Sequence, residues 1–122
     1  KAIFVEKNPK HYNILKSNIE KFENTFSGEY ETEKVKADSI KWITQRRELF
    51  LVESNIIFFD PPYESVDLYQ SLIDLLKELG EELKAVVLIE ADRQQSFEIK
   101  YLEDNLDIKK LFKQGTSFIA MI

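Results

Sequence analysis

The residues Asp60-Pro61-Pro62-Tyr63 follow four apolar residues directly, so an acid, two prolines and an aromatic ring stand where an apolar strand should end. Each proline disfavours the helical region for the residue before it, which keeps Asp60 and Pro61 extended. Neither proline has a backbone N–H, so the strand's ladder must end here while the carbonyls of Asp60 and Pro61 stay free to accept. The motif therefore predicts a stiff, acceptor-rich edge beside an aromatic ring.

Such an edge suits an amino group that is attached to an aromatic ring. The two N–H donors of the amine can meet the Asp60 carboxylate and the Pro61 carbonyl, while Tyr63 stacks on the face of the ring. Holding both hydrogens directs the nitrogen lone pair toward an electrophile. The alternative interpretation is a tight turn that only ends the strand, with Tyr63 packed on the surface.

Acidic residues follow each of the first four predicted strands, in the order Glu6, Asp38, Asp60, and then Glu90 with Asp92. In open α/β sheets, ligands bind beyond the carboxyl ends of the strands. For Glu6 a specific possibility is that its carboxylate accepts hydrogen bonds from both hydroxyls of a ribose, as acids in nucleotide-binding βαβ units do. The alternative for each acid is a cap that favours the following helix.

Hydrophobic spacing predicts the elements that position these residues. Apolar residues recur at spacings of three and four over residues 9–23 and 68–79, which is typical of amphipathic helices. Asn8 and Ser39 are predicted N-caps, and Gly80 is a natural helix end. Strands are predicted from residue 2 and over 34–37, 56–59, 85–91, 108–115 and 116–122, with a short helix or two within 94–106.

Strands that are apolar on both faces and alternate with amphipathic helices predict a mainly parallel sheet covered on both sides. The last two strands are predicted to form an antiparallel hairpin through Gly115. No internal repeat or linker is visible, so residues 1–122 are predicted to form a single α/β domain.

Composition excludes several classes of site. The chain of 122 residues has no cysteine, which excludes thiolate chemistry, and one histidine, which leaves little for a transition-metal site, so no metal is expected. No apolar run approaches the roughly 20 residues that cross a bilayer, and the N-terminus lacks the long apolar segment of a signal peptide. A cytoplasmic protein is expected.

The segments "FVEKN", "KADS" and "FFDPPYE", in this order and spacing, resemble the Rossmann-like (class I) S-adenosylmethionine-dependent methyltransferases that act on exocyclic amines. The resemblance is closest to the bacterial 16S ribosomal RNA guanine-N2 methyltransferases and covers almost the whole chain. It implies a mostly parallel, seven-stranded sheet whose last strand is antiparallel and lies beside the fifth. It also implies that Glu6 binds the cofactor's ribose, that Asp38 and Ser39 lie by its adenine, and that Asp60, Pro61, Pro62 and Tyr63 form the target-base pocket.

The chain departs from this family in one respect. The family's first strand and its glycine-rich cofactor loop should lie immediately before Lys1. The chain has three glycines, too far apart to form such a loop: Gly28, Gly80 and Gly115. The resemblance therefore implies that these residues are the C-terminal part of a longer protein and lack the first, central strand.

The reaction that the resemblance implies is direct transfer of a methyl group from the sulfonium of S-adenosylmethionine to guanine N2, without a covalent enzyme intermediate or a metal. The expected partner is ribosomal RNA or a small-subunit assembly intermediate. The net charge of −5 argues against phosphate binding. Family members, however, carry a basic N-terminal segment that contributes to RNA binding.

Two alternatives remain open. DNA adenine-N6 methyltransferases share the Asp-Pro-Pro-Tyr motif, because adenine N6 and guanine N2 are the same kind of amine. From a different class, a non-catalytic α/β module with a nucleotide-binding or structural role is compatible with the missing glycine-rich loop.

Overall fold

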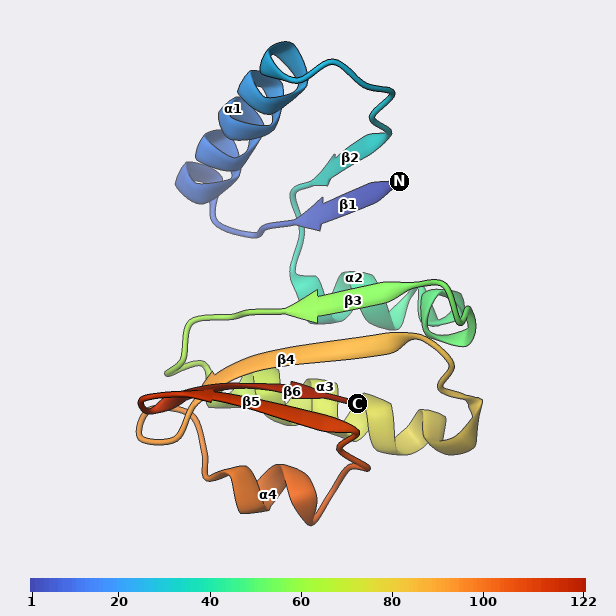
Figure 1. Ribbon diagram of the computed structural model, residues 1–122, viewed down its shortest axis with the longest axis vertical. Coiled ribbons are helices and arrows are strands. Elements are labelled where there is room, and N and C mark those ends of the chain that lie inside the picture. The colour runs from blue at the N-terminus through green and yellow to red at the C-terminus, as the bar shows by residue number, and fades with distance from the viewer. The chain divides into compact units, whose positions relative to one another are not determined.

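The computed structural model describes residues 1–122 and divides into two compact units, Lys1–Gln45 and Arg46–Ile122 (Figure 1). The first unit contains β1 (Ala2–Val5), α1 (Pro9–Thr25), β2 (Thr32–Val35) and α2 (Ser39–Thr44). The second contains η1 (Arg47–Leu51), β3 (Ile56–Phe59), α3 (Val66–Leu79), η2 (Gly80–Glu82), β4 (Val86–Asp92), α4 (Ile99–Glu103), β5 (Lys110–Gln114) and β6 (Ser117–Met121).

The first unit is a βαβ unit in which β1 and β2 pair in parallel, from Ala2 opposite Thr32 to Val5 opposite Val35. Helix α1 connects the two strands. It begins after Asn8, whose side chain accepts hydrogen bonds from the N–H groups of the second and third helical residues, and Pro9 occupies the first helical position. The predicted N-cap is therefore confirmed, and it sets where the chain turns away from β1.

Two predictions in this unit are wrong in detail. The strand predicted over residues 34–37 is β2, Thr32–Val35, because its pairing with β1 fixes the register and local propensity does not. The N-cap of α2 is Asp38 and not Ser39, since the Asp38 carboxylate accepts the N–H of Lys41 at 3.0 Å. Ser39 is the first helical residue and takes no part in the cap.

The second unit has a four-stranded sheet in the order β3-β4-β6-β5. β3 and β4 pair in parallel, whereas β6 pairs antiparallel with both β4 and β5. The last strand therefore lies between two strands that precede it in the chain. The predicted hairpin is confirmed: β5 turns into β6 at Gly115, whose φ of +61° is accessible to glycine without steric cost.

The core of this unit lies between the sheet and α3, which runs behind the strands in Figure 1. The leucine-rich stripe of α3 is buried, and the ring of Tyr69 on this helix meets that of Phe59 edge-on at 5.8 Å between centroids. Alternate residues of β4 and β6 complete the core on this face: Val87, Ile89, Ala91, Phe118 and Ala120. As predicted, α3 ends at Gly80, which has a positive φ.

The opposite face of the same sheet is open within this unit, with Ile56, Phe58 and Phe112 exposed at 70%, 54% and 48%. β3 pairs only with β4, and β1 pairs only with β2, so each is an edge strand of its own sheet. The mixture of α-helices with parallel and antiparallel strands is compatible with a methyltransferase fold.

Candidate functional site

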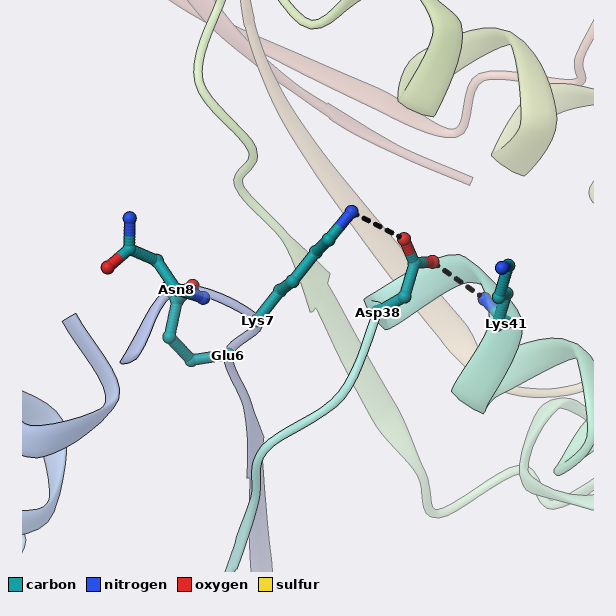
Figure 2. Close-up of polar contacts among 5 residues, drawn as sticks. All are labelled: Glu6, Lys7, Asn8, Asp38 and Lys41. Atoms are coloured by element: carbon teal, nitrogen blue, oxygen red, sulfur yellow. Dashed lines mark hydrogen bonds and ion pairs between the residues drawn. The ribbon is translucent and has the colours of Figure 1, made fainter. Parts of the chain in front are cut away.

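Glu6 and Asp38 lie at the same edge of the first unit, because the parallel strands β1 and β2 both end there (Figure 2). The pairing continues past the strands: the Glu6 N–H donates to the Val35 carbonyl at 3.0 Å, and the Ala37 N–H donates to the Glu6 carbonyl at 3.2 Å. These bonds hold the chain after β2 beside Glu6. The structure therefore brings together the residues that the sequence assigned to the cofactor.

The Glu6 carboxylate is oriented by the start of α1. Its Oε1 accepts the backbone N–H of Asn8 at 2.6 Å, and its Oε2 takes no part in this bond. The second oxygen thus keeps its lone pairs while the first is fixed by the backbone. A carboxylate with this arrangement can accept hydrogen bonds from ribose hydroxyls.

Both oxygens of Asp38 already have partners. Oδ1 accepts the Lys41 N–H at the start of α2, and Oδ2 is 3.3 Å from the Lys7 ammonium, as Figure 2 shows. The Lys41 N–H, assisted by Lys7, holds the pKa of Asp38 below its usual value. Asp38 is therefore first of all a helix cap, which is the alternative that the sequence left open for it. Lys7 is exposed, so its ion pair contributes little and can open.

The second group of predicted residues lies after β3 in the other unit. The pairing between β3 and β4 ends at Phe59 opposite Ile89, so Asp60 directly follows β3 and Glu90 is the next residue of β4. No hydrogen bond contributes to the pKa of the Asp60 carboxyl, so its carboxylate is available as an acceptor. Although Asp60 is largely exposed, partial desolvation of its carboxyl raises its pKa, and repulsion from Glu90 raises it further.

Tyr63 is anchored at two points. Its hydroxyl donates to Oε1 of Glu90 in β4 at 2.9 Å, and its backbone carbonyl accepts from the Ser96 hydroxyl at 2.8 Å. Donation to the carboxylate is the main reason why the pKa of Tyr63 is raised. The ring is thus held in place by the fold, which would lower the entropic cost of stacking a ligand on it.

The Pro61 carbonyl is less free than the sequence suggested. The Tyr69 hydroxyl donates its shorter hydrogen bond, at 2.8 Å, to the carbonyl oxygen of Glu90. It also lies 3.3 Å from the Pro61 carbonyl oxygen, which is the weaker of the two contacts. Tyr69 is 1% exposed, and desolvation raises its pKa to about 12. Because a carbonyl oxygen has two lone pairs, Pro61 can still accept one N–H from a ligand.

Sequence reasoning missed the residues that hold this loop. Tyr69 is buried in α3 beside its leucines, but the leucine spacing that predicted this helix did not include it, and nothing in the sequence indicated its two carbonyl contacts. Ser96 carried no signal. Glu90 was noted only as an acid after a strand. Asp92 is structural but caps no helix: it is 3% exposed, and its oxygens accept from the Thr116 hydroxyl and from the N–H groups of Gln94 and Gln95 in the turn that follows β4.

Metal-binding clusters and membrane-spanning helices are both missing from the chain. Residues 1–122 contain no group of three or more histidine, aspartate or glutamate side chains that could hold a metal ion. None of the helices is both long enough and apolar enough to cross a membrane.

Comparison with known proteins gives one match at the family level. No curated protein matches the chain. A family model described as conserved hypothetical protein 95 matches residues 1–122, and thus every element that positions Glu6, Asp38 and Asp60. This is the family of 16S ribosomal RNA methyltransferases that the three sequence segments resemble. The chain belongs to this methyltransferase family.

Proposed function

We propose that the chain carries out S-adenosylmethionine-dependent methyl transfer to guanine N2 of 16S ribosomal RNA. The observation that carries this proposal is the loop after β3: an unpaired Asp60 carboxylate, a Pro61 carbonyl with a lone pair to spare, and a Tyr63 ring anchored to Glu90. Membership of a ribosomal RNA methyltransferase family supports the same reaction. We further propose that both units belong to one class I methyltransferase domain, which acts in the cytoplasm.

The residues proposed to bind the cofactor, Glu6, Asp38 and Ser39, fit S-adenosylmethionine first of all at its ribose. Glu6 offers a free carboxylate oxygen, and the Asn8 N–H fixes its orientation. Asp38 and Ser39 would lie by the adenine, and rotation of the exposed Lys7 side chain would free Oδ2 of Asp38 for that contact. When bound, the cofactor supplies an electrophilic methyl group on a sulfonium.

On the base side, Asp60 accepts one N–H of the guanine amine and the Pro61 carbonyl accepts the other, while the Tyr63 ring supports the base from one face. This arrangement holds the amine with its lone pair directed away from the acceptors. The chain lowers the barrier mainly by alignment, and no residue becomes covalently attached to the substrate. Asp60 is also suited to receive the proton that the amine loses, because its pKa is raised.

The test uses the full-length protein, labelled S-adenosylmethionine and ribosomal RNA, either free or in a small-subunit assembly intermediate. Digestion of the RNA to nucleosides and mass spectrometry identify the methylated base. Asp60→Ala should abolish transfer and leave cofactor binding, measured by calorimetry, nearly unchanged. Asp107→Ala, at an exposed aspartate outside the site, is the matched control and should retain full activity. Undiminished turnover of Asp60→Ala would reject the assignment.

A further inference from the structure

The carboxylates of Asp60 and Glu90 lie side by side on one face of the sheet. β3 and β4 are parallel, with Phe58 opposite Leu88. Side chains alternate between faces along a strand, so Asp60 shares the face of Phe58, and Glu90 shares the face of Leu88. Neighbouring strands are roughly 4.8 Å apart, which places the two carboxylates within reach of a single base.

Glu90 has acceptor capacity to spare. Its Oε1 accepts the Tyr63 hydroxyl at 2.9 Å, and its other oxygen receives no hydrogen bond. The salt bridges of the structure involve carboxylates other than those of Glu90 and Asp60. Two adjacent carboxylates without a cation favour a ligand edge that presents N–H donors, and they oppose an edge that presents a lone pair.

Nucleobases differ in this respect. Guanine presents the N2 amine and the neighbouring N1–H, which are donors side by side. Adenine presents the N6 amine beside N1, which is an acceptor. If Asp60 accepts the amine of either base, the adjacent carboxylate meets a donor in guanine and a lone pair in adenine.

We propose that Glu90 is a specificity-determining residue that selects guanine by accepting its ring N1–H. The proposal rests on the proposed methyltransferase function and deepens it, because Asp60 and Tyr63 treat the two purines alike. Tyr63 contributes by occupying Oε1 of Glu90, which leaves the second oxygen for the base. A good pair of base contacts discriminates by about tenfold to a hundredfold or more.

The experiment compares guanine with 2-aminopurine, which keeps the amine at position 2 but has a lone pair at N1. Mapping of the wild-type product on 16S ribosomal RNA first identifies the methylated nucleotide, and RNA with either base at that position is then supplied to the full-length enzyme. The ratio of kcat/KM for the two RNAs is measured. Because the ratio is internal to each variant, incomplete folding lowers both rates and leaves it unchanged.

Wild-type enzyme should favour guanine over 2-aminopurine by about tenfold or more. In Glu90→Gln, the Tyr63 hydroxyl should keep the amide oxygen, so the amide N–H₂ faces the base and the preference should fall to about one or reverse. Glu90→Ala has neither donor nor acceptor and should show little preference. Tyr63→Phe removes the hydroxyl but keeps Glu90, and should lower both rates while the preference for guanine persists.

The outcomes separate the two proposals. A wild-type ratio near one, or an unchanged ratio in both Glu90 variants with guanine still methylated, overturns the role of Glu90 and leaves the methyltransferase function intact. Absence of any methyl transfer to guanine by the wild-type enzyme overturns both. A preference that falls in the Glu90 variants and persists in Tyr63→Phe supports base selection by Glu90.

Discussion

The hydroxyl of Tyr69 in α3 donates a hydrogen bond to the backbone carbonyl of Glu90 in β4 at 2.8 Å and lies 3.3 Å from the carbonyl of Pro61. One buried side chain therefore links the loop after β3 to the end of β4. The same strand end holds Tyr63 through the Glu90 carboxylate. The loop after β3 is thus positioned by contacts from outside its own sequence.

Tyr69→Phe should weaken both the fold and the site. Loss of the hydroxyl removes a hydrogen bond from a buried position, and the free energy of unfolding should fall by about 1 kcal/mol. kcat should fall as the Pro61 carbonyl loses its support, whereas cofactor affinity should not change. Chemical denaturation and steady-state kinetics measure these effects. Tyr30→Phe removes a hydroxyl from an exposed tyrosine of the other unit and is the control, and a loss of activity there as large as in Tyr69→Phe would contradict the explanation.

Asp60→Asn should raise stability while it lowers activity. The pKa of Asp60 is raised in the folded protein, so the folded state binds this proton more tightly than the unfolded state does. Stability is then lost as pH rises through the raised pKa, so the ionised carboxylate destabilises the folded protein at neutral pH. The gain from this substitution should be below about 1 kcal/mol because the group is largely solvated. Thermal unfolding should show it at pH 7 and not in acid.

Asp92→Ala should destabilise the protein with the opposite pH dependence. Asp92 accepts the Thr116 hydroxyl and two backbone N–H groups, and the hydrogen bond from Thr116 is the main reason why its pKa is lowered from 3.8. A lowered pKa contributes stability above the ordinary value of aspartate, and that stability disappears as pH falls through the folded pKa. The melting temperature should therefore drop at pH 7 and approach that of the wild type in strong acid. A pH-independent difference would assign the effect to packing alone.

Asp38→Ala should reveal the cap of α2. Replacement of an N-cap by alanine costs about 1 kcal/mol, whereas Asp38→Asn keeps an acceptor and should cost a few tenths. Ser39→Ala should cost little, since Ser39 does not cap the helix. Denaturant titrations of the three variants rank these effects. A larger loss for Ser39→Ala than for Asp38→Ala would contradict the assignment of the cap.

Local chemistry made much of the fold predictable. Asn8 followed by Pro9 marked the start of α1, Gly80 ended α3, and Gly115 marked the hairpin, because each of these residues acts through its own backbone or its nearest neighbours. The loop after β3 was equally predictable, since a proline, which has no N–H, ends the hydrogen-bond ladder of a strand. The cap of α2 was misplaced by one residue, because two adjacent side chains, Asp38 and Ser39, are both good caps.

The residues assigned to the proposed chemistry are recognisable in the chain alone: Glu6 at the end of one strand and the motif Asp60–Tyr63 at the end of another. Which residues hold that motif in place, and which charges lie beside it, is decided only by the tertiary structure. Glu90 lies beside Asp60 because β3 and β4 pair in one register, and Tyr69 reaches two carbonyls because α3 packs on that sheet. Register and packing depend on contacts between residues far apart in the chain, which local spacing does not encode.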